Sequence, residues 1–303
     1  MSTILECEGV VKRFGKTVAL NGITLSLEEN KIYGLIGRNG AGKTTLLGIL
    51  SGQNHSDDGS VVVNGAPVWE NADAIENICF SRELSPSTSF GPDTRKVRHL
   101  LRIARIFYPG WDEEYAQSLI NEFKLEVKKP LNKLSKGMLS MVSIVIALAS
   151  RAPITFLDEP VAGLDVMMRE LFYRLLLDDY MKYPRTFVIS THIIDEASGV
   201  FEEVVLVDAG SVMLKKNTEE LRASYAYVSG REDTVLEAVS GMEIVHREGL
   251  AKSLTVCVKA NDAKQRLTGY DVDVSPVSLQ KIFVYLTERY DQDRSTRTGG
   301  VPA

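Results

Sequence analysis

The segment Gly37–Thr44, with the sequence GRNGAGKT, constrains the fold of this chain more than any other feature. It fits the pattern G-x-x-x-x-G-K-[ST], in which glycines let backbone N–H groups curl around phosphate oxygens without clashes from Cβ atoms. The apolar run KIYGLI precedes it, and Thr44–Leu50 has the character of a helix start. A buried strand, this loop and a helix together predict an α/β fold with a phosphate site at the loop.

The residues of this loop have distinct expected roles. Lys43 would place a compact cation on the β- and γ-phosphates, and Thr44 would offer its hydroxyl to Mg²⁺. The helix that follows would direct the partial positive charge of its N-terminus toward the same phosphates. The predicted phosphate-binding residues are Gly37, Asn39, Gly40, Ala41, Gly42, Lys43, Thr44 and Thr45.

A second motif, Ile154–Pro160 with the sequence ITFLDEP, places two carboxylates at the end of an apolar strand. Ligands of open α/β sheets bind at the carboxyl ends of the strands. Asp158 could therefore hold Mg²⁺ through water, and Glu159 could polarise an attacking water. Taken alone, the motif is equally consistent with a strand-end ion-pair site. Because it follows the phosphate loop, it becomes a candidate hydrolytic centre.

The patterns along the chain predict several structural regions. Strands alternate with helices from Ile154 to Asp208, which predicts a mostly parallel sheet with helices on its faces. β-rich runs near the start and a hairpin signal at Asn64-Gly65 predict an antiparallel β subdomain. Residues 84–150 are predicted to form a helical insert.

From Glu219 onward the pattern changes. Short alternating runs surround helical segments, which predicts a small C-terminal α/β domain over residues 219–290, after a first domain over residues 1–218. The polar sequence DQDRSTRTGGVPA of residues 291–303 predicts a disordered tail.

Composition argues against several classes of protein. With 35 basic and 40 acidic residues the formal net charge is −5, which gives a nucleic-acid partner no support. The three cysteines, Cys7, Cys79 and Cys257, lie far apart, which argues against a disulfide framework or a zinc site and fits a reducing compartment. The start of the chain lacks a signal-peptide pattern, and the apolar stretch Met138–Ser150 is too short to span a bilayer. We therefore expect a soluble chain.

Three further motifs, together with the two above, resemble those of the ABC (ATP-binding cassette) ATPases. Leu134–Met138, LSKGM, resembles the LSGGQ signature, Ala162–Asp165, AGLD, resembles the D-loop, and His192 closes a predicted strand as the switch histidine does. Order and spacing also match, because the signature precedes Asp158 by 24 positions and His192 follows it by 34. The resemblance covers about residues 1–216 and implies a P-loop NTPase core.

The resemblance also implies roles for single residues. Such ATPases work as head-to-tail dimers that hold two ATP molecules, and the signature of one subunit faces the phosphate loop of the other. Ser135 and the backbone N–H of Gly137 would bind the γ-phosphate held by the second subunit, and Asp165 of the D-loop would be a further nucleotide-binding residue. His192 would contact the γ-phosphate and the attacking water, and Glu159 would act as general base.

Several positions depart from the usual family pattern. Phe14 stands where the family has an aromatic, usually Tyr, that stacks on adenine; the alternative is an ordinary core residue. In the signature, Lys136 replaces a glycine and Met138 replaces a glutamine. Glu83 stands at the expected glutamine of the Q-loop, where its carboxylate could still ligate Mg²⁺; the alternative is a solvated surface residue.

The segment Ser275–Thr287 resembles the closing helix of ABC-2 type exporter ATPases. This resemblance implies an ATP- and Mg²⁺-dependent ATPase that powers an ABC-2 type transporter, an exporter of drugs, peptides or lipids. The expected partners are a separate integral membrane permease and a second ABC ATPase, identical or not; the expected location is cytoplasmic, on the inner face of the plasma membrane. Two alternatives remain open: a non-transport ABC ATPase of regulatory, translation or repair type, and a small-molecule P-loop kinase, which would not need Leu134–Met138 or His192.

Overall fold

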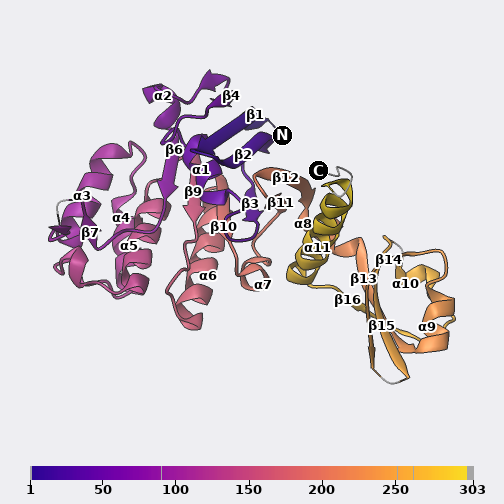
Figure 1. Cartoon of the computed structure of the whole chain (residues 1–303). Helices are drawn as coiled ribbons and strands as arrows, with labels where there is room; N and C mark the ends of the chain where they lie inside the picture. The colour runs from indigo at the N-terminus through magenta and orange to yellow at the C-terminus, as the bar shows by residue number, and fades with distance from the viewer. Residues whose placement is uncertain (1, 90, 251, 262, 299–303) are drawn as a thin grey trace. The chain divides into compact units, whose positions relative to one another are not determined.

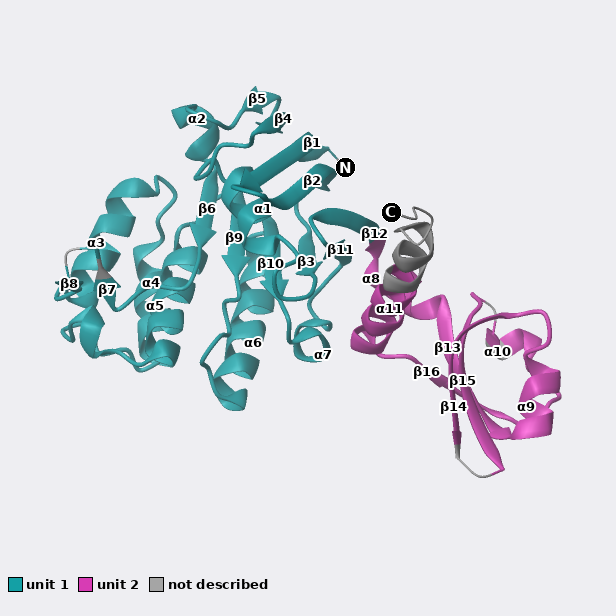
Figure 2. Ribbon diagram, in the orientation of Figure 1, with its two compact units in different colours: residues 1–215 teal, residues 216–303 magenta. Residues whose placement is uncertain are grey.

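The computed structural model describes residues 2–89, 91–250, 252–261 and 263–298. The chain divides into two compact units, residues 1–215 and residues 216–303 (Figure 2). The domain boundary predicted after residue 218 lies close to this division, just beyond the end of strand β12 (Ser211–Asn217).

A six-stranded, mostly parallel sheet forms the centre of the first unit (Figure 1). Besides β12, its strands are β3 (Ile32–Ile36), β6 (Ile78–Ser81), β9 (Ile154–Asp158), β10 (Thr186–Thr191) and β11 (Glu203–Asp208). The strand order is β12-β11-β3-β10-β9-β6, and the pairs from β11 to β6 are parallel. Every residue of β3, β9 and β10 is buried, as expected for parallel strands covered on both faces.

A four-stranded sheet forms the predicted antiparallel subdomain. Its strands, in the spatial order β2-β1-β4-β5, are β1 (Thr3–Phe14), β2 (Thr17–Glu28), β4 (Asp58–Val63) and β5 (Ala66–Pro67). The predicted hairpin joins β4 to β5, and Asn64 and Gly65 have the positive φ values, 50° and 78°, that a type I′ turn requires. Leu20 and Leu27 of β2 share one core with Leu46 of helix α1 (Lys43–Leu50).

Helices α3 (Val97–Phe107), α4 (Glu113–Glu122) and α5 (Lys136–Ala149) make up the helical insert. Two of them begin at side-chain caps: Asp112 accepts a hydrogen bond from the N–H of Tyr115 in α4, and Ser135 accepts one from the N–H of Met138 in α5. The remaining elements of this unit are α2 (Ala72–Ile75), β7 (Ser87–Thr88), β8 (Gly91–Pro92), a 3₁₀ turn (Leu131–Lys133), the long helix α6 (Val166–Lys182) and α7 (Ile194–Ala197).

The second unit is a small α/β domain whose central elements follow the ferredoxin-like order β-α-β-β-α-β. These elements are β13 (Tyr225–Arg231), α9 (Glu232–Ala238), β14 (Glu243–Leu250), β15 (Ser253–Lys259), α10 (Ala263–Arg266) and β16 (Asp273–Pro276), with α8 (Thr218–Ala223) before them and α11 (Leu279–Thr298) after them. The antiparallel sheet has the order β14-β15-β13-β16. Val228 and Val256 of the sheet and Val235 of α9 belong to one separate core.

The C-terminal helix differs from one prediction. The sequence predicts a disordered tail over residues 291–303, whereas the backbone of α11 continues as helix to Thr298, and residues 299–303 lie outside the described part of the chain. The segment before Gly299 is polar but contains neither Gly nor Pro, so it holds no strong helix breaker. Within the described ranges, no helix has the length and apolar character needed to cross a membrane.

Candidate active site

The phosphate loop lies between the carboxyl end of β3 and the first turn of α1. Gly40 and Gly42 have φ values of 80° and 102°, a region that residues with a Cβ atom rarely adopt. A Cβ atom on Gly42 would also lie 2.7 Å from the carbonyl oxygen of Ala19 in β2, so only glycine permits this curve of the backbone. Of the other predicted loop residues, Gly37 and Ala41 are buried, and Asn39 and Gly40 are exposed.

Lys43 is held inside this loop. It is 7% exposed, and its Nζ donates to the carbonyl oxygens of Gly37 and Arg38 at 2.8 and 3.2 Å. Burial lowers the pKa of Lys43, while the charges of Glu159 and Asp158 oppose that shift. The carboxylates of the second motif therefore lie near enough to act on this cation, and the two motifs form one site.

Ser190 makes hydrogen bonds to both acidic residues of the second motif. Asp158 pairs with Ser190 in the parallel register of β9 and β10, and the Ser190 hydroxyl donates to Asp158 Oδ1 at 2.5 Å. The N–H of Glu159 donates to the carbonyl oxygen and to Oγ of the same serine, at 3.2 and 3.0 Å. Glu159 has a φ of 49°, which is uncommon for a residue other than glycine and typical of a position held by its surroundings.

His192 lies directly beside Glu159. Its Nδ1 is 2.6 Å from Glu159 Oε2, and the two side chains are 54% and 25% exposed. In the tautomer with the proton on Nδ1, the imidazole donates to the carboxylate, which leaves Nε2 and the second carboxylate oxygen for other partners. The structure thus brings together four predicted residues: Lys43, Asp158, Glu159 and His192.

Thr44 and Thr45 lie in the first turn of α1, where Thr44 is exposed and Thr45 is half-buried. The hydroxyl of Thr44 and the carboxylate of Asp158 are hard oxygen donors of the kind that Mg²⁺ prefers. Among the described residues, no group of three or more His, Cys, Asp or Glu side chains could hold a metal ion. With the two oxygen donors of Thr44 and Asp158, the site fits a magnesium ion that would take phosphate oxygens of a nucleotide as its further ligands.

Phe14 lies at the end of β1, where it is 57% exposed. The Nζ of Lys12 lies 5.7 Å from the centre of its ring, and the same ammonium pairs with Asp57 at 2.9 Å. The exposed ring excludes the alternative of a core phenylalanine. It leaves a face on which a flat ligand such as adenine could stack.

The signature segment Leu134–Met138 and the D-loop Ala162–Asp165 pack against each other. A Cβ atom on Gly137 would lie 2.5 Å from the carbonyl oxygen of Gly163, and the Ser140 hydroxyl donates to the carbonyl oxygen of Ala162 at 2.7 Å. Ser135 caps α5, and Asp165 caps α6 by accepting a bond from the N–H of Met168 at 2.9 Å. These residues therefore present two helix N-termini from one tightly packed junction.

The structure pairs Glu83 with Lys136, two of the positions that depart from the family pattern. Lys136 Nζ lies 3.2 Å from Glu83 Oε2, and the side chains are 55% and 54% exposed. Sequence reasoning considered each position separately and missed this ion pair. The signal that could have revealed it is that one departure adds a positive charge and the other adds a negative one.

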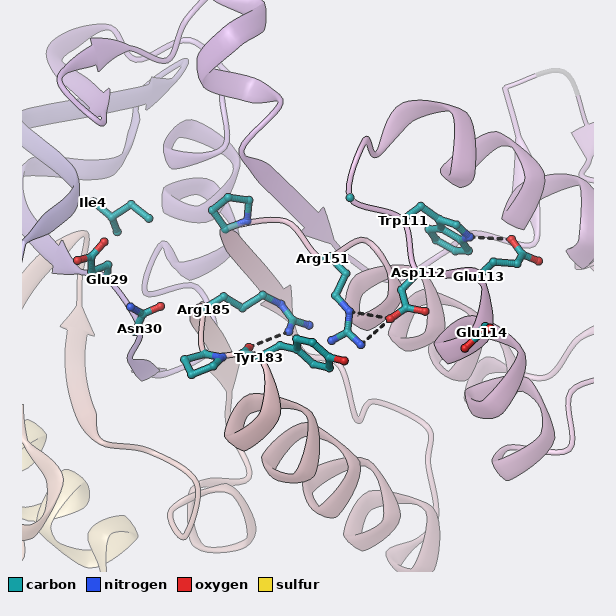
Figure 3. A pocket seen from close by; sticks show the side chains of 13 residues that line it. Ile4, Glu29, Asn30, Trp111, Asp112, Glu113, Glu114, Arg151, Tyr183 and Arg185 are labelled. Atoms are coloured by element: carbon teal, nitrogen blue, oxygen red, sulfur yellow. Dashed lines mark hydrogen bonds and ion pairs between the residues drawn. The ribbon is translucent and has the colours of Figure 1, made fainter.

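A pocket also lies at the opposite edge of the sheet, where Pro153 and Arg185 come just before β9 and β10 (Figure 3). Arg151 donates to Asp112 Oδ2 through Nε and Nη2, and Figure 3 shows this contact between the core and the insert. Ligands of parallel sheets bind at the carboxyl ends of the strands, so this pocket is separate from the candidate active site. Sequence reasoning did not identify its charged residues.

Comparisons with known proteins agree with this geometry. A family profile described as "ABC transporter" matches residues 20–162. The chain is 24% identical over 287 residues to the ABC transporter ATP-binding protein YtrB of Bacillus subtilis (strain 168), covering 93% of this chain and 97% of that protein. It is 32% identical over 213 residues to the Nod factor export ATP-binding protein I of Burkholderia orbicola (strain AU 1054), covering 68% of each.

The fold is also similar to that of solved ATP-binding cassettes. A dimeric cassette in a post-hydrolysis state with ADP and Pi superposes with a TM-score of 0.60 at 23% identity, covering 71% of this chain and 99% of that one. The relatives, the family profile and the ordered motifs lead to one conclusion. This chain belongs to the ATP-binding proteins of the ABC transporter family.

Proposed function

We propose that this chain is the ATP-hydrolysing subunit of an ABC-2 type exporter for drugs, peptides or lipids, and that it acts on the inner face of the plasma membrane through a separate permease. Relatives named for Nod factor export and lantibiotic transport support export. The observation that carries the hydrolytic part is the Glu159–His192 pair beside the buried cation of Lys43.

The chain's own residues form one half of the proposed composite site. ATP and Mg²⁺, when bound, supply the triphosphate and neutralise its developing charge. Lys43 holds the phosphates, and Glu159 accepts the proton of the attacking water through the oxygen that does not face His192. His192 keeps that carboxylate in one orientation, because its Nδ1 lies within hydrogen-bond distance of Oε2.

The other half of the site comes from a second cassette. Ser135 and Gly137 lie at the N-terminus of the fourteen-residue helix α5, which directs backbone N–H groups and a partial positive charge outward. In a head-to-tail dimer this terminus would face the γ-phosphate held by the other phosphate loop. Binding of ATP then closes the dimer, and hydrolysis reopens it.

The substitution Glu159→Gln tests this mechanism. Removal of the general base should lower phosphate release at least a hundredfold, leave ATP affinity intact and accumulate closed dimers in size-exclusion chromatography. Glu114→Gln, an exposed carboxylate at the opposite pocket, is the control and should release phosphate like the parent chain. Full turnover by Glu159→Gln would show that Glu159 is not the general base.

Co-purification from membranes tests the coupling to transport. A permease of about six apolar spans should be recovered with the tagged chain and identified by mass spectrometry. As the control, a lysate from which the membranes have been removed should yield no such protein. Recovery of ribosomes or DNA-repair proteins in its place would favour a non-transport ABC ATPase.

A further inference from the structure

We propose that Lys136 is an additional phosphate-binding residue for the nucleotide of the second cassette, and that Glu83 holds it as a counter-ion until nucleotide binds. The inference rests on the proposed dimer. It goes beyond that dimer by assigning a cation to a signature position that is usually glycine. The proposal also connects the two nucleotide sites, because Glu83 stands in the Q-loop of the chain's own site and Lys136 would face the nucleotide of the second cassette.

The position of Lys136 places its charge at the helix terminus that faces the second cassette. It is the first residue of α5, directly after the capping Ser135. Its aliphatic stem lies against the D-loop, because a Cβ atom built on Gly163 would lie 2.7 Å from Lys136 Cγ. The stem is thus packed at its base, while the Lys136 side chain as a whole is 55% exposed.

Glu83 is attached to the same helix through its neighbours in the chain. The Ser81 hydroxyl donates to the carbonyl oxygen of Ser143 at 3.2 Å, and the Ser143 hydroxyl donates to the carbonyl oxygen of Arg82 at 3.3 Å. Both bonds join the segment before Glu83 to α5. The backbone that carries Glu83 is thus held on the same helix as Lys136, so the ion pair joins two side chains of one packed unit.

The energetics favour an exchange of partners. An ion pair exposed to this degree adds little net free energy, so either side chain can leave it easily. Lys136 gains more from a triphosphate in a closed, water-poor interface than from one exposed carboxylate. Glu83 keeps an oxygen donor of the kind that Mg²⁺ accepts. Occupation of the chain's own site would thus free Lys136 for the opposite triphosphate.

The first test measures ATP-driven dimerisation in the Glu159→Gln background by light scattering. Lys136→Met keeps a packed stem but removes the charge, and it should raise the ATP concentration for half-dimerisation at least tenfold. Lys136→Arg keeps the charge, so the ATP concentration for half-dimerisation should rise no more than threefold. ATP affinity of the dilute monomer should stay within twofold in both variants, because Lys136 serves the other cassette.

The second test uses Glu83→Gln, which removes the counter-ion but retains a side-chain oxygen for Mg²⁺. It should lower the ATP concentration for half-dimerisation about threefold, and the gain should vanish in the double variant with Lys136→Met. Dimerisation of Lys136→Met at the parent's ATP concentration, or a gain that persists in the double variant, overturns the inference. Absence of dimers from the Glu159→Gln parent itself would instead overturn the proposed function.

Discussion

Glycine is required at positions 137 and 163 for two different reasons. Gly137 is buried at the start of α5 and lies so close to the D-loop that a side chain has no room. Gly163 has a φ of 78°, and the aliphatic stem of Lys136 packs directly against it. The signature and D-loop patterns of the sequence therefore encode a packing junction, in addition to the phosphate contacts proposed for them.

The substitution Gly137→Ala tests this junction. The new Cβ atom would meet the carbonyl oxygen of Gly163 at 2.5 Å, so the D-loop must move. We expect a loss of about 1–3 kcal/mol in the free energy of unfolding, measured in urea, and a reduced ATPase rate. Gly199→Ala, where a Cβ atom meets nothing within 4 Å, should change neither quantity.

Lys43 provides a second prediction at this scale. Lys43→Ala removes the cation held in the loop and proposed to bind phosphate, and a charge-assisted bond contributes about 1.5–3 kcal/mol. ATP affinity, measured with a fluorescent nucleotide analogue, should fall at least tenfold. Lys128→Ala, at an exposed lysine of the helical insert, should bind the analogue like the parent. Normal binding by Lys43→Ala would contradict the assignment of the phosphate loop.

At the scale of secondary-structure elements, a buried cluster of charges joins α6 to its neighbours. Asp179 of α6 has a side chain only 1% exposed, and it pairs with Arg151 before β9 and with Arg185 before β10. The Arg151 guanidinium also lies 4.5 Å from the Tyr115 ring and 4.2 Å from the Tyr183 ring. This cluster therefore connects the core with α4 of the insert.

Asp179→Asn should destabilise the first unit strongly. The change leaves the buried guanidinium of Arg185 without its carboxylate partner and removes one of the two carboxylates that Arg151 contacts, and breaking a buried pair in this way costs about 3–5 kcal/mol. Chemical unfolding of the full chain would show the loss. Glu126→Gln breaks an exposed pair with Lys129 and should cost less than about 1 kcal/mol. Equal stability of the two variants would contradict the structural role of the cluster.

The sequence predicts well those parts of the fold and site that depend on local pattern. The buried strands, the hairpin at Asn64-Gly65 and the phosphate loop all follow from neighbouring residues. The cluster around Asp179 was not predictable, because only the packed fold brings Arg151, 28 residues away, and Arg185 onto the same buried carboxylate. The same holds for the Glu83–Lys136 pair, which forms only when β6 and α5 pack together. The end of α11 was missed because polar composition alone does not decide between helix and coil.

At the scale of the whole molecule, each unit has a core of its own. In residues 216–303 the ferredoxin-like sheet packs around Val228, Val256 and Val235, and the first unit buries a separate and larger cluster. Separate cores are what independently folding domains require. The residues proposed for ATP hydrolysis all lie in the first unit, so the second unit can be examined apart from them.

The isolated segment 216–303 should therefore fold by itself. A domain of this length is expected to have a stability of about 4–13 kcal/mol, and its circular dichroism should disappear in one cooperative thermal transition. Val235→Asp would bury a charge in a fully enclosed position of α9 and should abolish that transition. Leu236→Asp makes a comparable apolar-to-Asp change at the next position, which is 38% exposed, and should leave the transition in place. A gradual melt of the unsubstituted segment, or equal melting of the two variants, would mean that residues 216–303 depend on the first unit for their fold.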